Sequence, residues 1–259
     1  MPTDAGAEQH GLGWRIGWTL AGFAPFVAIS AVHLATKFAE DTPLEGFTKA
    51  LAIPSLAVGL GGILLTTHRK PRVVVVALLF IGLALSWVGD VALERSLAVG
   101  LAFFLAAHLA YIATFQLAFP HRRPSRWALL AIPWFLALLV LVGPLLGGMF
   151  VPVVLYSAIL GLMAVWASRG TPLTTVGALL FVASDTILAF RTFTPRLPHN
   201  NWRLLVMPTY LTAQLLMSLG VLRVEDLTAG DQERLIRTSG SPVSSSRVSW
   251  PSGANPQPS

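Results

Sequence analysis

Long stretches without any charged residue constrain this chain more than any other feature of its sequence. About 42 residues from Trp127 to Ser168 pass without an Asp, Glu, Lys or Arg. One helix needs only about 20 apolar residues to cross the ~30 Å hydrocarbon core of a bilayer, so this stretch is long enough for two crossings. Charged residues make up 12% of the chain, whereas a soluble domain usually contains about 25%. The sequence therefore excludes an ordinary soluble protein and predicts transmembrane helices.

Eight spans are predicted when the overlong stretches are divided at Pro and Gly, the residues that favour turns between helices. Within the longest stretch the division falls at Pro144, Gly147, Gly148 and Pro152. The predicted fold is all-α, an eight-helix transmembrane bundle over residues 1–222. Its spans are expected at about Ile16–Thr36, Ala50–Thr67, Val73–Leu93, Ser96–Phe119, Trp127–Val142, Phe150–Ser168, Pro172–Phe190 and Leu204–Leu222.

The two ends of the chain are expected to differ in character. The N-terminal part has one Arg before its apolar stretch and lacks a short apolar segment followed by a clean cleavage site. We therefore expect a retained first span rather than a cleaved signal peptide. After Arg223 the sequence becomes rich in Ser, Pro, Gly and charge. Such a composition buries too little apolar surface to order a segment, which predicts a disordered cytoplasmic tail over residues 223–259.

The surplus of positive charge indicates an orientation in the membrane. Lys and Arg total 18 and Asp and Glu total 12, which gives a net charge of +6. With eight crossings, most basic residues fall on one side, which the positive-inside rule places in the cytoplasm together with both termini. Because these residues lie between apolar stretches rather than on one polar face, we expect no nucleic-acid partner. The cytoplasmic set is Arg15, Arg69, Lys70, Arg72, Arg122, Arg123, Arg126, Arg169 and four Arg of the tail.

The balance between the two basic residue types bears on the source. The chain has 15 Arg and 3 Lys. This ratio is typical of a GC-rich bacterium, so the expected location is the bacterial cytoplasmic membrane. The chain has no cysteine. Disulfides, Cys-ligated zinc and thiolate nucleophiles are therefore excluded, and any chemistry must use oxygen and nitrogen groups.

Two aspartates, Asp90 and Asp185, lie inside predicted spans. An ionisable side chain there costs roughly 2.5 to 3.5 kcal/mol on insertion scales and marks a functional site by default. A small residue precedes each of them, Gly89 and Ser184 respectively. Small residues let a neighbouring helix approach closely. The structural alternative is that the aspartates pair with Lys49 or hydrogen-bond neighbouring helices.

Other polar residues are expected at a similar depth. Lys49 opens the second span, while Tyr210 and Gln214 are four residues apart on one face of the eighth. His108 and Tyr111 share one face of the fourth, at mid-depth. These residues predict one polar pocket around the aspartates. Each also has a structural reading: a snorkelling Lys, interhelical hydrogen bonds for His108 and Gln214, and interfacial anchoring for the tyrosines.

The positions of the aspartates allow a repeat. Asp90 stands on the third span and Asp185 on the seventh, so a cut after the fourth span gives a possible 4+4 parallel repeat about an axis along the membrane normal. A metal-assisted site formed by His108 with both aspartates is a further alternative. We expect no metal and no cofactor, because His108 is the one histidine in this group.

The order and spacing of these residues resemble the YhhN family, which includes animal transmembrane lysoplasmalogenases. The resemblance covers about Leu12 to Gly220. It implies a membrane hydrolase that cleaves the vinyl ether bond of a lysophospholipid-type substrate, with Asp90 and Asp185 as the catalytic candidates. The matching positions are Thr48-Lys49, Gly89-Asp90, His108 with Tyr111, Ser184-Asp185 and Tyr210 with Ala213-Gln214.

Vinyl ether hydrolysis requires one carboxylic acid and one carboxylate. We expect one of Asp90 and Asp185 to protonate the alkene carbon and the other to stabilise the oxocarbenium ion and activate water, as two carboxylates do in glycosidases. Lys49 and Tyr210 would hold the phosphate or glycerol end, and His108 would orient a carboxylate or relay a proton. A proton-coupled transporter or lipid-binding membrane protein is the alternative, because intramembrane acids on paired helices also occur in carriers.

Overall fold

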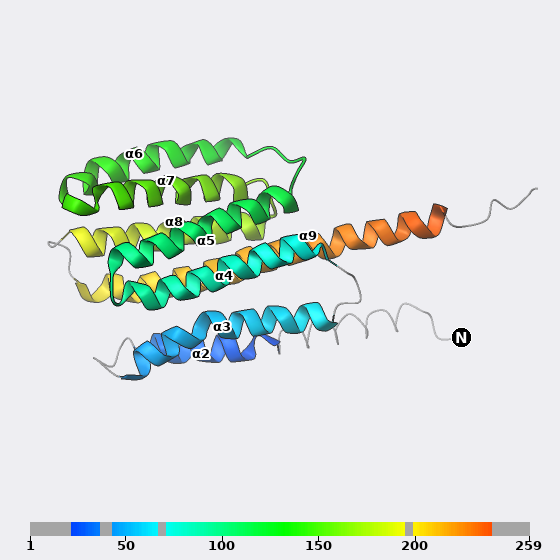
Figure 1. Ribbon diagram of the computed structural model, residues 1–259, viewed down its shortest axis with the longest axis horizontal. Helices are drawn as coiled ribbons and strands as arrows, with labels where there is room; N and C mark the ends of the chain where they lie inside the picture. The colour runs from blue at the N-terminus through cyan, green and yellow to red at the C-terminus, as the bar shows by residue number, and fades with distance from the viewer. Residues whose placement is uncertain (1–21, 37–42, 67–70, 195–198, 240–259) are drawn as a thin grey trace, which may run out of the picture.

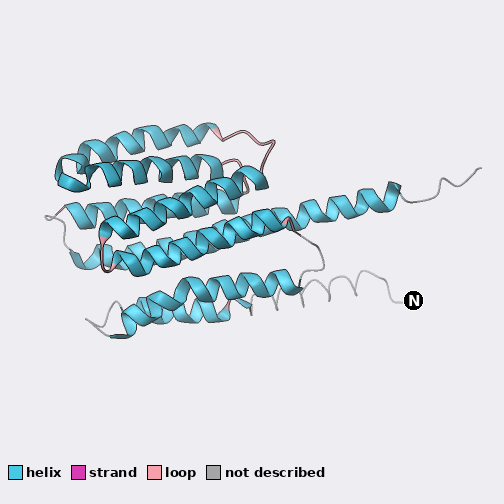
Figure 2. Ribbon diagram, viewed as in Figure 1, coloured by secondary structure: helices cyan, strands magenta, loops and turns pink. Residues whose placement is uncertain are grey.

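The computed structural model describes residues 22–36, 43–66, 71–194 and 199–239, and these residues form helices without any β-strand (Figures 1 and 2). The long helices lie side by side as one bundle (Figure 1). They are α2 (Ala24–Thr36), α3 (Pro43–Thr66), α4 (Val73–Leu93), α5 (Leu97–Ala118), α6 (Ala131–Val142), α7 (Phe150–Ala167), α8 (Pro172–Phe193) and α9 (His199–Ser239). Short 3₁₀ turns flank α6: η1 (Arg126–Leu130), η2 (Gly143–Leu145) and η3 (Gly147–Met149).

Seven helical segments of the described residues are long and apolar enough to cross a membrane. They correspond to the second through eighth predicted spans, and the all-α polytopic bundle is confirmed. The first predicted span begins in residues 1–21, which lie outside the described residues. Its described part, α2, has 13 residues, or about 20 Å at 1.5 Å per residue, which is less than the hydrocarbon thickness. The seven segments are Leu44–Leu65, Val73–Leu93, Leu97–Ala118, Arg126–Leu145, Gly147–Ala167, Pro172–Phe193 and Leu204–Glu225.

Local sequence accounts for the ends of several helices. The hydroxyl of Ser96 accepts a hydrogen bond from the Val99 N–H at 3.5 Å and caps α5. Thr171 caps α8 in the same way at 3.2 Å, and Pro172 occupies the first turn, where its missing N–H costs no hydrogen bond. Between α6 and α7, Gly147 adopts a φ of 52°, a conformation that glycine tolerates best. The turn predicted within the longest uncharged stretch is confirmed.

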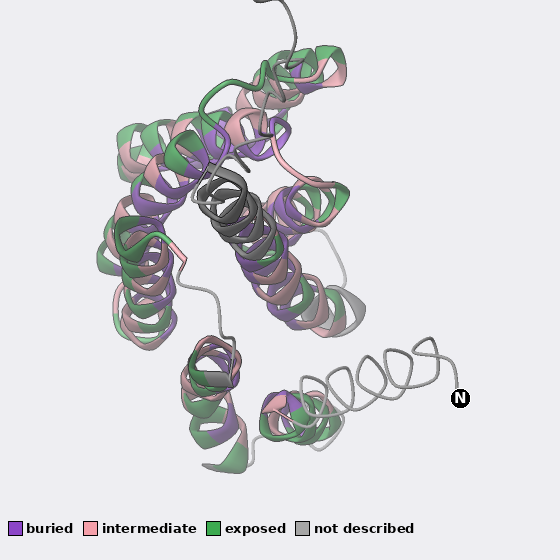
Figure 3. Ribbon diagram, turned by 90° about the vertical axis from the view of Figure 1, so that its right-hand side faces the viewer, coloured by how far each residue is buried: buried purple, intermediate pink, exposed green. Residues whose placement is uncertain are grey.

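The helices pack most extensively in two pairs, α4 with α5 and α8 with α9. Each pair begins with a helix that carries one of the two aspartates. Apolar side chains such as Ile132, Leu136 and Val140 of α6 point outward. Buried residues gather on the inward faces of the helices (Figure 3). This pattern suits a bundle whose exterior contacts lipid rather than water.

Arginines tie helices together at the end of the bundle where α5 ends and α8 begins. Arg169 is 9% exposed and donates to the carbonyls of Arg122, Phe119 and Pro120 just beyond α5. A basic side chain is favoured at a helix C-terminus because it satisfies the last carbonyls. Arg72, at the start of α4, binds Glu225 of α9 with its backbone N–H and its guanidinium. These arginines therefore have a packing role in addition to any effect on orientation.

Helix α9 continues through Arg223 to Ser239 and extends beyond the rest of the bundle (Figure 1). The sequence predicted a disordered tail from Arg223 onward, but the residues from Arg223 to Ser239 continue the helix. Glu225 is 1% exposed and forms an ion pair with Arg72. Once a helix has formed, each added residue gains a backbone hydrogen bond, so a polar composition alone does not stop it.

Gly177 should be required for the contact between α8 and α9. A Cβ at this position would lie 2.8 Å from the backbone N of Met217 and 2.9 Å from the carbonyl O of Ala213. We expect Gly177→Ala to force the helices apart and to lower the free energy of unfolding by about 1–3 kcal/mol. Thermal unfolding of the purified protein in detergent measures this loss. Gly61→Ala is the matched control, because a Cβ at Gly61 meets nothing within 4 Å; equal midpoints for the two variants would contradict the prediction.

Candidate active site

Asp90 lies inside the bundle and is hydrogen-bonded to a tyrosine. The buried residues of α4 recur every three or four positions and include Ser86, Gly89 and Asp90, so the register of this helix turns the carboxyl inward. The hydroxyl of Tyr210 on α9 donates to Asp90 Oδ2 at 2.7 Å. Asp90 is 5% exposed and Tyr210 is 3% exposed. A buried polar group is costly unless it is hydrogen-bonded, and each of these two groups satisfies the other.

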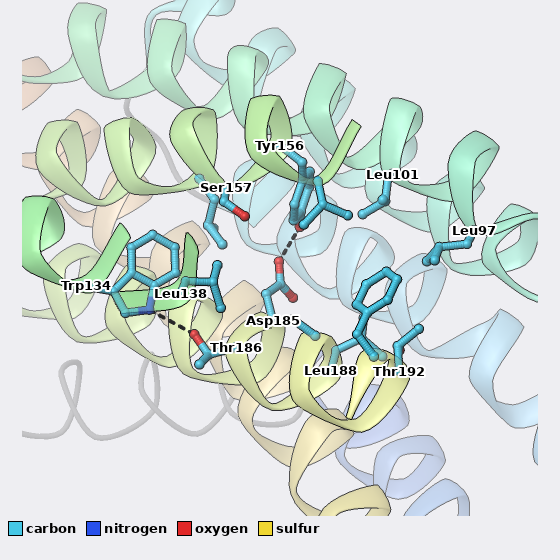
Figure 4. A pocket seen from close by; sticks show the side chains of 14 residues that line it. Leu97, Leu101, Trp134, Leu138, Tyr156, Ser157, Asp185, Thr186, Leu188 and Thr192 are labelled. Atoms are coloured by element: carbon cyan, nitrogen blue, oxygen red, sulfur yellow. Dashed lines mark hydrogen bonds between the residues drawn. The ribbon is translucent and has the colours of Figure 1, made fainter. Parts of the chain in front are cut away.

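Asp185 has a tyrosine partner of its own. The hydroxyl of Tyr156 on α7 donates to Asp185 Oδ2 on α8 (Figure 4). Tyr156 was not among the residues that the sequence singled out. A signal was present, because the chain has only three tyrosines and Tyr156 lies well inside a predicted span. The structure places all three tyrosine hydroxyls in the candidate site.

His108 lies between the two carboxyl–tyrosine pairs. Its ring contacts the Tyr156 ring edge-on at a centroid distance of 5.3 Å and the Phe181 ring at 4.8 Å. Phe181 contacts Tyr210 in turn at 5.3 Å. These rings join the two halves of the site.

The tautomer of His108 follows from its hydrogen bond. Nδ1 lies 2.5 Å from the carbonyl oxygen of Phe104. A carbonyl oxygen only accepts, so Nδ1 carries the proton and, in the neutral ring, Nε2 is an acceptor. Nε2 is buried and finds no hydrogen-bond partner in the described part of the chain. The site therefore contains an unoccupied basic nitrogen, which a substrate or water could use.

Lys49 contacts the outer edge of this site but not the carboxyl group of Asp90. Its Nζ donates to the backbone carbonyl of Asp90 at 3.1 Å and to Glu94 Oε1 at 3.2 Å. Helix α3 begins at Pro43, so Lys49 lies within the helix rather than at its start. Lys49 therefore bonds to the backbone of Asp90 rather than forming an ion pair with its carboxyl group. Lys49 instead ties α3 to the end of α4.

A second hydrogen-bonded group lies one helical turn from Tyr210. The Tyr111 hydroxyl donates to Gln214 Oε1 at 2.7 Å and lies 3.3 Å from Ser86 Oγ. The ring of Tyr111 occupies space that a Cβ at Gly82 would need. Gln214 Nε2 is buried without a partner among the described residues. Sequence reasoning missed Ser86, although it is four residues before Asp90 and therefore on the same face of α4.

Ser184 points toward a different neighbour from that of Asp185. Its hydroxyl donates to the carbonyl oxygen of Val206 at 2.9 Å and so joins α8 to α9. Of the six predicted residues other than the two aspartates, the structure therefore gathers five in the region of Asp90 and Asp185, while Ser184 lies in the seam between two helices. Among the described residues, no group of three or more His, Asp or Glu side chains is placed to hold a metal ion.

A groove opens beside Asp185. It lies between α5, α6, α7 and α8. Leu101, Leu138 and Val153 contribute to its apolar walls, and Asp185 and Tyr156 face into it (Figure 4).

The fold and the site together define a class: a multi-pass membrane protein with paired carboxyl–tyrosine groups inside the bundle. Residues 44–221 match the YhhN family, and the chain belongs to this family.

Curated relatives support the same assignment. The chain is 36% identical to lysoplasmalogenase TMEM86B of Sus scrofa over 207 residues, which cover 76% of this chain and 85% of that protein. It is 32% identical to lysoplasmalogenase TMEM86B of Rattus norvegicus over 213 residues, or 77% and 83% of the two chains. The human protein of that name is 36% identical over 148 residues, or 54% and 62%. A comparison with solved structures finds no match.

The hydrogen bond between Tyr111 and Gln214 should be detectable as energetic coupling. We expect Tyr111→Phe to lower the free energy of unfolding by about 1–3 kcal/mol, because it leaves the buried Gln214 Oε1 without a donor. Adding Gln214→Leu should recover part of that loss, because both polar partners are then replaced by apolar groups. Unfolding midpoints of the two single variants and the double variant in detergent measure the coupling. Additive effects would show that the two side chains do not depend on each other.

Proposed function

We propose that this chain is a membrane-embedded lysoplasmalogenase. It would hydrolyse the vinyl ether bond of a single-chain ether phospholipid and release a fatty aldehyde and a glycerophospho-alcohol. Relatives that bear this name cover more than three quarters of the chain. The observation that carries the proposal is the pair of aspartates inside an apolar bundle, each held by a tyrosine from another helix.

The proposed reaction uses the two carboxyl groups in different roles. One aspartic acid would transfer its proton to the alkene carbon, and the other, as a carboxylate, would stabilise the oxocarbenium ion and activate the water that attacks it. Both effects are stronger in a site from which bulk water is excluded. The tyrosine hydroxyl on Oδ2 of each aspartate would fix the orientation of that carboxyl.

Three further residues would support the reaction. Lys49 lies at the edge of the site with Nζ hydrogen-bonded to the half-exposed Glu94. A lipid phosphate could displace that partner, so Lys49 would hold the head group. His108 Nε2 would accept a hydrogen bond from the attacking water or from a carboxylic acid. Gln214 and Tyr111 would hold α5 and α9 in register behind Tyr210.

The finer location belongs to the same proposal. We place both termini in the cytoplasm of a bacterial cell, with the protein in the cytoplasmic membrane. Arg72, Arg122 and Arg169 gather at one end of the bundle, and Lys49 and Glu94 pair at the other. The positive-inside rule favours the first end as cytoplasmic. The candidate site then lies toward the outer leaflet.

Aspartate substitutions test the mechanism. We expect Asp90→Asn and Asp185→Asn each to reduce aldehyde release from lysoplasmalogen by about 100-fold or more, since general acid–base groups typically contribute 10²–10⁴-fold. Aldehyde is measured with the purified protein, and the ester analogue of the lipid serves as a second substrate. Glu45→Gln is the control, a carboxylate removed from the start of α3 and outside the site.

Two outcomes would overturn this proposal. Folded Asn variants that retain full activity would remove the aspartates from the chemistry. Failure of the wild-type protein to release aldehyde, together with lipid-dependent proton flux in liposomes, would identify a carrier instead.

A further inference from the structure

The two aspartates face different surroundings. Asp185 lies in the wall of the groove between α5, α6, α7 and α8, and it is the one carboxylate among the described residues that line this groove. Asp90 lies outside that lining. It is bonded to Tyr210 on α9, and its backbone carbonyl meets Lys49 near the ion pair with Glu94. Asp185 therefore lies beside the apolar groove, and Asp90 lies near the polar edge of the site.

Most of the side chains that line the groove are apolar, as the binding of an aliphatic chain requires. Apolar side chains lie on both sides of Asp185, with Trp134 and Leu138 toward one end and Leu97 and Leu188 toward the other (Figure 4). Polar atoms are confined to a few side chains. The Trp134 indole N–H is one of them, and it donates to Thr186 Oγ1 at 3.0 Å. An apolar ligand with one reactive point near Asp185 matches this distribution.

The depth of Asp185 fits the order of groups in the proposed substrate. Asp185 is eight positions before Phe193, where α8 ends. It therefore lies about 12 Å along the helix from this end, which we place at the outer membrane face. Leu97 marks the start of α5 at the same face. A lipid whose phosphate stays at this surface would send its glycerol and then its vinyl ether down the groove toward Asp185.

We propose that this groove binds the alkenyl chain of the substrate and that Asp185, rather than Asp90, is the acid that protonates it. This inference rests on the proposed lysoplasmalogenase function. The proposed reaction does not say which aspartate is the acid, and this inference assigns that role to Asp185. It also makes the groove the part of the site that determines specificity for the alkenyl chain. Asp90 with Tyr210 provides the negative charge opposite the oxocarbenium ion.

The proposed reaction requires no reactant other than the lipid and water. The Asp185 O–H bond breaks as its proton joins the second carbon of the alkenyl chain, and the C=C electron pair forms the new C–H bond. The first carbon and its ether oxygen then share the positive charge. Asp90 accepts the proton of the attacking water as the water oxygen adds to that carbon, and the proton then passes to the Asp185 carboxylate, which restores both groups. The resulting hemiacetal breaks its bond to the glycerol oxygen, which takes up the hydroxyl proton and leaves the aldehyde.

Narrowing the groove tests where the chain lies. Ala189 lines the groove, and Ala183 lies on the exposed face of the same helix. We expect Ala189→Phe to lower kcat/KM for a long-chain lysoplasmalogen relative to a short-chain one by about tenfold or more, because the ring displaces several methylenes from the groove. Ala183→Phe should keep the wild-type ratio. Equal chain-length profiles in an active wild type and in both variants would overturn the groove assignment while leaving the proposed function intact.

A non-hydrolysable probe makes the test independent of turnover. A saturated alkyl ether lysophospholipid with a diazirine on its chain should label α5, α6, α7 or α8 beside the groove, and Ala189→Phe should reduce this labelling. Labelling confined to α2 and α3 would overturn the assignment even if the enzyme proves inactive on lysoplasmalogen.

The choice of acid is tested by turnover and binding together. Asp185→Asn should reduce kcat at least about tenfold more than Asp90→Asn does, while the saturated probe still labels both proteins. The reverse order of the two variants would overturn the assignment of Asp185 as the proton donor.

Discussion

The hydrogen bond from a tyrosine to a buried carboxyl group is the interaction on which this site depends. A carboxyl group in an apolar bundle is costly unless a donor satisfies it. Tyr210 and Tyr156 meet this requirement for Asp90 and Asp185, and each does so from a different helix. The two hydrogen bonds therefore tie α4 to α9 and α7 to α8. A tyrosine brings one polar atom on a large apolar ring, which suits a membrane interior.

The two halves of the site are built alike but open differently. Both pair an aspartate with a tyrosine, and His108 and Phe181 connect them through edge-on ring contacts. The half with Asp185 meets an apolar groove, whereas the half with Asp90 meets the Lys49–Glu94 pair. A lipid substrate has the same division, an apolar chain joined to a charged head. The unequal surroundings give two chemically identical carboxyl groups different roles in the proposed reaction.

The arginines at the end of the bundle opposite Lys49 have more than one role. Arg169 closes the C-terminal end of α5, and Arg72 anchors the extended α9 through Glu225. The same side chains belong to the basic set from which the orientation was inferred. A guanidinium suits both purposes because it remains charged and offers several donors in a fixed geometry. Composition alone did not reveal that α9 continues past Arg223.

The sequence by itself determined the second through eighth spans, the turn at Gly147, the membrane setting and the positions of both aspartates, because length, apolar content and charge act locally along the chain. It also placed Lys49, His108, Tyr111, Tyr210 and Gln214 near them by depth. Only the tertiary structure decided which side chains meet. Asp90 and Tyr210 are 120 residues apart, and Tyr156 and Asp185 are 29 apart. Helical periodicity fixes the face on which a residue lies, but not which helix packs opposite that face. For this physical reason the sequence could not reveal the partnership of Tyr156, the seam position of Ser184 or the groove that separates the environments of the two aspartates.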